Sequence, residues 1–248
     1  MKKFLITALI AITGFAAQAQ VQETRRISEF TRIEVKNGIE VIITQGDKAS
    51  VKVESDDYNK IKNIMTEYNG DVLKIYGKGN VPVSDSYKVL RVYVTQKNIT
   101  GLRASSGASI KLAAEMNANG LAIDLSSGAT FKGKVNCAGA FKLDAGSGSY
   151  FDGIVVTDLF HGDLKGGAVV KIAGMAKNSV INSTNSATCL AANFKCQNVK
   201  VNAKNTSSVV VNVENSIKAN SDDTASITYY GSPSETSLGA ESYAVKRN

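Results

Sequence analysis

The sequence has 248 residues and a formal net charge of +7, with 7% aromatic residues and no Trp. Its Lys and Arg residues are scattered. The chain therefore offers neither the basic cluster nor the stacking aromatic side chains that nucleic-acid binding requires. We expect no nucleic-acid partner.

The first 19 residues have the features of an export signal. Lys2 and Lys3 precede an apolar run over residues 4–15, and Ala17-Gln18-Ala19 fits the small-x-small rule for cleavage. The alternative, a transmembrane anchor, needs about 20 apolar residues, and this run is shorter. We predict cleavage after Ala19, which leaves 229 residues (248 minus 19). We expect a chain exported to the periplasm, the cell surface or the medium, with no membrane span in its mature part.

The segment from about residue 27 to residue 100 has mostly strand patterns. Asn37-Gly38 supplies a turn, and Ile61, Ile64 and Met65 fall at the spacing of a short helix. We expect this segment to form the first coils and an irregular N-terminal cap of a single domain over residues 20–248. Apolar residues alternate with polar ones over 30–35, 39–43, 51–53, 72–76 and 89–95.

From about residue 101 to residue 230 the sequence repeats itself. The copies resemble Ser106-Gly107-Ala108-Ser109-Ile110, and their second residues are separated by 21, 20, 19, 19, 21 and 17 positions. A near-fixed period is typical of repeat architectures, in which each unit buries its apolar face only by stacking on its neighbours. The second residues are Gly107, Gly128, Gly148, Gly167, Ser186, Ser207 and Thr224.

Each copy contains an apolar residue three positions after that Gly, Ser or Thr. Apolar and polar residues alternate around it, which favours strands over helices. Short strands at a period of about 20 predict an all-β, single-domain parallel β-helix, in which like residues stack about 4.8 Å apart. The alternative is an antiparallel β-sandwich, whose turns recur every 8–12 residues or so. The apolar column expected to point inward is Ile110, Phe131, Phe151, Val170, Cys189, Val210 and Ile227.

The three Cys residues, Cys137, Cys189 and Cys196, allow at most one internal disulfide. Cys189 falls in the apolar column, so we expect it to be a small buried hydrophobe. The sequence contains no Cys-x-x-Cys, and we expect neither a metal site nor a cofactor.

Several short motifs, in their order, resemble those of a known family. Residues 37–46 (NGIEVIITQG), residues 90–95 (LRVYVT), the Ser-Gly-Ala repeats and residues 230–233 (YGSP) are similar to those of the putative auto-transporter adhesins, head GIN domain. The resemblance spans about residues 27–245 and implies an exported β-helix of Bacteroidetes-type bacteria, related in shape to pectin-lyase-type solenoids. The adhesion role of the family rests on shape, and the resemblance implies no catalytic residues. In the motif of the family name, this chain has Glu40 in place of Asn.

One outward column contains the candidate binding residues Arg103, Asp124, Asp144 and Asp163, each four residues before a corner. Stacked carboxylates about 5 Å apart could hold calcium against an acidic polysaccharide, as in solenoid lyases. Lys142 and His161 stand two residues before Asp144 and Asp163 and can neutralise them instead, as an ordinary surface network. We favour the second interpretation.

The remaining polar residues form no catalytic set. His161 is the single His, and no Gly-x-Ser-x-Gly surrounds a Ser. Lys111, Lys132, Asp152 and Lys171 form a second outward ladder that we interpret as a solvated face. We expect an exported, non-enzymatic β-helix that binds a surface glycan or an envelope protein, with a homo-oligomer left open. The alternative is a polysaccharide lyase or hydrolase on the same scaffold.

Overall fold

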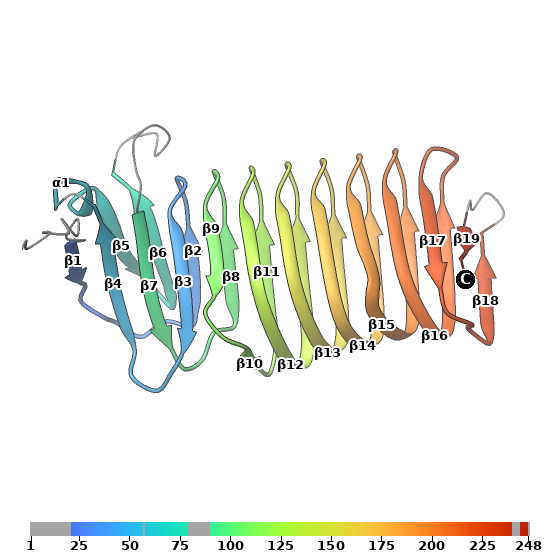
Figure 1. Ribbon diagram of the computed structural model, residues 1–248, viewed down its shortest axis with the longest axis horizontal. Helices are drawn as coiled ribbons and strands as arrows, with labels where there is room; N and C mark the ends of the chain where they lie inside the picture. Colours follow the sequence, from blue (N-terminus) through green and yellow to red (C-terminus); the bar gives the residue numbers. More distant parts are fainter. Residues whose placement is uncertain (1–20, 57, 79–89, 240–243, 248) are drawn as a thin grey trace, which may run out of the picture.

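The computed structural model describes residues 21–56, 58–78, 90–239 and 244–247. The predicted signal peptide lies outside these ranges. The described chain forms an elongated stack of coils, in which the strands run across the long axis and lie side by side along it (Figure 1). The predicted parallel β-solenoid is confirmed, because successive copies of the repeat pair in parallel with like residues in register.

The regular coils bury a slab between two sheets. A coil contributes one strand to each sheet, and from β12 to β16 a single long strand bends and serves both. In β12 the bend lies where the pairing register shifts between Cys137 and Ala140. The strands are β8 (Gly101–Ala104), β9 (Ser109–Leu112), β10 (Met116–Ala118), β11 (Leu121–Leu125), β12 (Thr130–Ala145), β13 (Tyr150–Leu164), β14 (Val169–Ser183), β15 (Thr188–Ala203), β16 (Ser208–Ser221) and β17 (Ser226–Tyr230).

We name the two outer surfaces after their sheets. Face A is the outer surface of the sheet that contains β8, β11 and residues 140–145 of β12. Face B is the outer surface of the sheet that contains β9, residues 130–137 of β12 and their counterparts in later coils. Because side chains alternate along a strand, every second residue of each sheet points out and the others fill the slab.

The core contains a chain of contacting aromatic rings. Phe131 and Phe151 stack with their centroids 5.0 Å apart, and Phe151 meets Phe141 edge-on at 6.1 Å. Phe160 links Phe141 to Phe194. Gly162 breaks one apolar column, because a Cβ there would lie about 3.0 Å from the Phe160 ring that fills its place. The large Phe160 ring thus fills the core volume that the small Gly162 leaves open.

The predicted inward column is correct for Ile110, Phe131, Phe151, Val170, Cys189 and Ile227, all of which are buried. The prediction is wrong for Val210. Val209 pairs with Cys189 and Ile227 and is buried, whereas Val210 pairs with Leu190 and lies half-buried on face B. The sixth copy is therefore centred on Thr206 rather than Ser207. Because strand periodicity is two, that one-residue error in the alignment exchanges the inner and outer positions.

The coils turn at tight corners made of two consecutive residues with positive φ. Gly107 (φ 73°) follows Ser106 (φ 54°), and the pair repeats as Asn185-Ser186 and Asn205-Thr206 without glycine. Asn37 and Gly38 adopt the same conformation, with φ of 62° and 69°. The predicted turn at Asn37-Gly38 is thus a further corner of the solenoid, a copy of the repeat that the sequence analysis did not recognise.

The N-terminal segment forms the cap at one end of the stack, but it is not a simple continuation. Strands β2 and β3 lie between β6/β7 and β8/β9, so the coil order in space differs from the chain order. The predicted helix is reduced to a single turn, because β5 begins three residues later and pairs antiparallel with β6. These elements are β1 (Val21–Thr24), β2 (Arg32–Val35), β3 (Glu40–Gln45), β4 (Ser50–Ser55), α1 (Tyr58–Ile61), β5 (Ile64–Asn69), β6 (Val72–Gly77) and β7 (Leu90–Gln96).

At the other end, the described part of the tail continues the two sheets. Strand β18 (Glu235–Leu238) pairs with β16, and β19 (Ala244–Lys246) pairs with β17, both in parallel. In the described chain, no helix is both long and apolar enough to cross a membrane.

Candidate functional site

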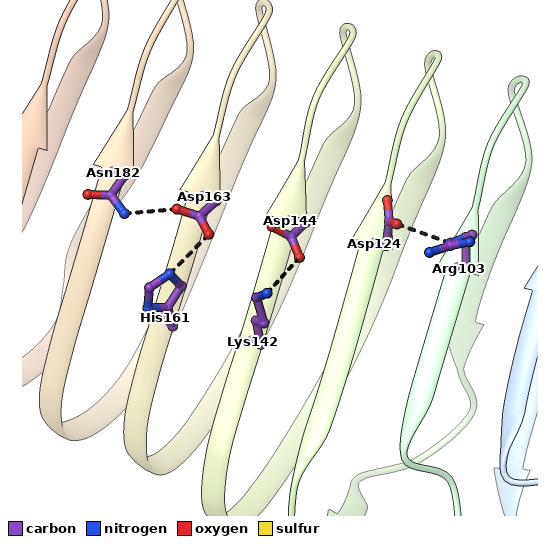
Figure 2. A network of polar contacts seen from close by, with 7 residues as sticks. All are labelled: Arg103, Asp124, Lys142, Asp144, His161, Asp163 and Asn182. Atoms are coloured by element: carbon purple, nitrogen blue, oxygen red, sulfur yellow. Dashed lines mark hydrogen bonds and ion pairs between the residues drawn. The ribbon is translucent and has the colours of Figure 1, made fainter.

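The predicted polar column exists and lies on face A. Arg103, Asp124, Asp144 and Asp163 are direct partners across neighbouring strands, followed by Asn182. Their inward neighbours are core residues, so the alternation points all five side chains outward. Figure 2 shows them as a ladder that crosses β8, β11, β12, β13 and β14.

Each carboxylate of the ladder has a close partner. Asp124 Oδ2 lies 3.0 Å from Arg103 Nε, on the neighbouring rung. Asp144 Oδ2 lies 3.5 Å from Lys142 Nζ, on its own rung (Figure 2). The Asp124 and Asp144 side chains are 42% and 44% exposed. At that exposure solvent screens the pairs, so we attribute to each no more than about 1 kcal/mol of stability.

Asp163 is the best-connected carboxylate of the ladder. Its Oδ2 lies 3.0 Å from His161 Nε2, and its Oδ1 accepts a hydrogen bond of 2.8 Å from Asn182 Nδ2. Partial burial by itself would raise the pKa of Asp163. The hydrogen bonds from Asn182 and His161, with the charge of Lys142, outweigh that effect and hold the pKa below its ordinary value. Asp163 therefore stays ionised at neutral pH.

The ladder is longer than the sequence analysis predicted. Asn202 donates to Asn182 Oδ1 at 2.9 Å, and Asn220 donates to Asn202 Oδ1 at 3.2 Å. These residues stand four positions before the corners at Thr206 and Thr224. The misplaced sixth corner hid Asn202, whereas Asn220 could have been found, because the seventh corner at Thr224 was placed correctly. At the other end, Glu34 of β2 is the strand partner of Arg103 of β8. This position extends the ladder into the N-terminal coil.

Two shallow depressions lie along face A. One, of about 240 Å³, is lined by Glu34, Arg103, Asp124 and Asp144 among others. The second, of about 410 Å³, lies toward the C-terminal end and is lined by amides and cations, including Asn178, Asn198, Lys200 and Lys218. Both are open to solvent and present polar side chains among apolar ones, so face A offers an accessible hydrogen-bonding surface rather than an enclosed chamber.

His161, the single His of the sequence, contacts the Asp163 carboxylate of the ladder. Within the described ranges, no three or more His, Cys, Asp or Glu residues are grouped so as to hold a metal ion. The three thiols are free and buried, and burial raises the pKa of Cys189 and of Cys196 to about 12. Those two thiols are therefore protonated at neutral pH and poorly nucleophilic.

The second predicted ladder is also in place, on face B. Lys111, Lys132, Asp152 and Lys171 are partners across neighbouring strands. Lys132 Nζ lies 3.8 Å from Asp152 Oδ2. The next residues of the column are Leu190 and Val210, so its polar character ends at β15.

Comparison with known proteins confirms the predicted resemblance. The sequence model of the family described as "Putative auto-transporter adhesin, head GIN domain" matches residues 29–233. No curated protein matches the chain. A putative adhesin from Parabacteroides merdae has a TM-score of 0.83 at 16% identity, over 92% of this chain and 96% of that chain.

Two further solved structures have the same fold. A putative lipid binding protein from Parabacteroides distasonis has a TM-score of 0.81 at 18% identity, over 92% of this chain and 97% of that chain. A putative adhesin from Bacteroides fragilis has a TM-score of 0.67 at 16% identity, over 94% of this chain and 98% of that chain. At these identities the likeness is one of fold, and it assigns no function to face A.

Proposed function

Since the chain belongs to the family described as "Putative auto-transporter adhesin, head GIN domain", we propose that it is an exported, non-enzymatic adhesin whose face A binds a surface glycan. The adhesin names of the structural relatives from Parabacteroides merdae and Bacteroides fragilis agree with this class of function. The export signal predicted at residues 1–19 would supply the export that this proposal requires.

The polar ladder on face A supports this proposal most directly. Carboxylates of Asp124, Asp144 and Asp163 accept hydrogen bonds, and the amides of Asn182 and Asn202 both donate and accept them. The side chains repeat along one line at about 4.8 Å per rung. A glycan chain presents hydroxyl groups along its length, so several sugar units can hydrogen-bond to successive rungs at once.

The same contacts argue against the enzyme alternative. A solenoid lyase needs carboxylates free to hold calcium and a base positioned at the sugar. Here Arg103 is engaged by Asp124, and Asp144 and Asp163 face Lys142 and His161. A calcium ion would have to displace Lys142 and His161 from the carboxylates. Arg103 could act as the base only after its contact with Asp124 was broken.

Binding of the mature chain to immobilised neutral and uronate-rich polysaccharides tests the proposal. Asp144→Ala should weaken binding by at least tenfold, because a hydrogen bond to a charged group contributes about 1.5–3 kcal/mol. Asp152→Ala is the matched control, since Asp152 is also an outward carboxylate with a lysine partner but lies on face B. Equal losses in the two variants would refute face A as the glycan site.

The enzyme alternative has a separate readout. Release of unsaturated sugar from the same polysaccharides in the presence of calcium, and its loss in Arg103→Ala, would replace the adhesin proposal with a lyase. We expect no release.

A further inference from the structure

Exposed large apolar side chains gather on face B of the central coils. Met175 is 55% exposed, Leu190 44%, Ile154 43% and Val156 39%. Val156 and Met175 are direct partners across β13 and β14, and Ile154 is the partner of Ala173. We call the surface formed by Ile154, Val156, Ala173, Met175, Leu190 and Val210 the apolar patch.

The apolar patch interrupts the alternation that governs the rest of the solenoid. In Ile154-Val155-Val156 only Val155 points into the core, so two β-branched residues occupy positions where other coils present Lys134 and Asn136. A depression of about 180 Å³ runs between Ile154, Leu190 and Val210. Contiguous exposed apolar residues on an otherwise polar sheet indicate an interaction surface rather than scatter.

Cations surround the apolar patch. Lys132 and Lys134 precede it on β12, Lys171 lies between Asp152 and Leu190, and Lys195 is the partner of Met175. Carboxylates also lie along this rim: Asp152 is 3.8 Å from Lys132, Asp158 is 2.8 Å from Lys177, and Glu115 and Glu214 line neighbouring depressions. With Lys111 and Lys177, six lysines stand against these four carboxylates, so the surface is apolar in its middle and carries a net positive charge at its edges.

We propose that face B docks on an anionic lipid bilayer surface, with the apolar patch entering the interface and the rim lysines contacting headgroup phosphates. Interfacial binding uses this combination of apolar side chains and cations. A second copy of the chain is a poorer occupant, because two such faces brought together would place lysine rims opposite each other. An apolar protein partner would leave the excess positive charge of the rim uncompensated.

Vesicle flotation with the mature chain tests this proposal. We expect binding to vesicles of equal parts phosphatidylcholine and phosphatidylglycerol, and little binding to vesicles of phosphatidylcholine alone. Binding should weaken as salt is added, because exposed charges are screened over about 8–10 Å at physiological ionic strength.

Two pairs of substitutions distinguish a specific contribution of the face B lysines from an effect of the net charge of the protein. Lys171→Gln with Lys195→Gln should lower the partition coefficient about 25-fold, since each lysine near an anionic surface contributes a factor of about five. Lys200→Gln with Lys218→Gln removes the same charge from face A, where both residues line the depression near β18. That control pair should change the partition coefficient by no more than about twofold, because the membrane lies beyond the screening length.

The apolar contribution has its own variant. Met175→Ser with Leu190→Ser should lower partition at least tenfold while the melting temperature stays unchanged, because both side chains already lie at the surface. Several outcomes would overturn the proposal: absence of binding by the native chain, equal losses from the two lysine pairs, or no effect of the serine variant. A concentration-dependent dimer, formed without lipid and abolished by Met175→Glu, would make a second copy the occupant instead.

Discussion

The coils from residue 101 to residue 230 and the N-terminal coil of β2 and β3 have the same geometry but a different relation to the chain. In the regular coils, each corner bonds to the next one along the sequence, as in Gly107 N to Ser127 O at 2.9 Å. The corner of β2 and β3 makes the same bond, Gly38 N to Ser106 O at 3.0 Å, across a much longer stretch of chain. That stretch contains the β4–β7 cap, part of which lies on the far side of β2 and β3.

The comparison of the two kinds of coil shows that the repeat determines the local geometry of a coil. The length of the loop that must close determines the order in which the coils fold. A regular coil can add to its neighbour as soon as about 20 residues are available, whereas the N-terminal coil must find β8 and β9 across a long loop. Closing that loop costs the chain conformational entropy before the stabilising contacts with β8 and β9 have formed. We expect the regular coils to fold first and the N-terminal coil to dock afterwards.

Disrupting the core of the regular coils should have the largest effect. Phe151→Ala removes the ring that contacts both Phe131 and Phe141 and should lower the free energy of unfolding by about 3–5 kcal/mol. Thermal or urea denaturation measures the change. Tyr150→Ala is the control, because Tyr150 is 39% exposed on the same strand and should cost less than about 0.5 kcal/mol. A similar cost for both would contradict the described orientation of β13.

The regular coils were largely predictable from the sequence, because their signals are local. A period near 20 and the alternation around Phe131, Phe151 and Val170 predict the strands, the corners and the inner column. The column of Asp124, Asp144 and Asp163 follows from the same period. The error at Val210 arose where Thr206 and Ser207 both suit a corner and glycine is absent, so composition could not fix the alignment.

The N-terminal coil was not predictable in the same way. Ile33, Gly38 and Val41 occupy the positions of Leu102, Gly107 and Ile110, but no neighbouring copy lies at the repeat distance. Its insertion between β6/β7 and β8/β9 depends on long-range pairing, which periodicity does not encode. The buried Glu54 was missed for the same reason: its partners Gln22, Tyr93 and Arg91 come from distant strands.

The Glu54 cluster offers a way to disrupt the N-terminal side alone. Glu54 is 3% exposed and accepts hydrogen bonds from Gln22 and Tyr93, with Arg91 Nη1 at 3.8 Å. Arg91→Met should cost about 1–3 kcal/mol, because it leaves a buried carboxylate short of a charge partner. In hydrogen exchange, β1, β4 and β7 should lose protection while the amides of β12–β16 keep theirs.

Lys132→Met is the matched control for Arg91→Met on a regular coil. Its partner Asp152 is 33% exposed at 3.8 Å, so solvent compensates and the cost should stay below about 1 kcal/mol. If Arg91→Met instead lowered amide protection from hydrogen exchange evenly along the solenoid, the N-terminal coil would not unfold separately from the regular coils.

A substitution at a corner without glycine tests the backbone conformation of the regular coils. Its effect on stability should be smaller than that of Arg91→Met. Thr206 is a β-branched residue held at φ 60°, a conformation that costs an L-residue about 1–2 kcal/mol. Thr206→Gly relieves that cost but loses an exposed hydroxyl contact to Ser186. We expect a net gain of about 0.5–1 kcal/mol in thermal denaturation. Gly128→Thr makes the reverse change at an equivalent corner and should destabilise; a loss in both variants would mean that the hydroxyl ladder outweighs the strain.

The smallest expected effect concerns acid stability at the junction of the N-terminal coil. The Asp71 carboxylate accepts hydrogen bonds from Arg32 and from Thr31 Oγ1, and these contacts link β6 to β2. The hydrogen bonds from Arg32, then from Thr31, lower the pKa of Asp71 from 3.8 to about 2. A carboxyl group whose pKa is depressed by folding stabilises the folded state above its unfolded pKa. That stabilisation is lost as the pH falls from about 4 to about 2, because the proton then binds the unfolded chain more tightly.

The measurement is the difference in melting temperature between the native chain and Asp71→Asn across that pH range. The difference should be constant from pH 5 to 7 or so, shrink below about pH 4, and approach zero only below about pH 2, where the native carboxyl group also becomes protonated. Because Asp71 and Arg32 are exposed, the difference should be small and should decrease with added salt. A difference that stayed constant down to pH 2 would show that the ion pair does not hold β2 against β6. The N-terminal coil would then be held by its strand pairing, its corner bond and its apolar contacts.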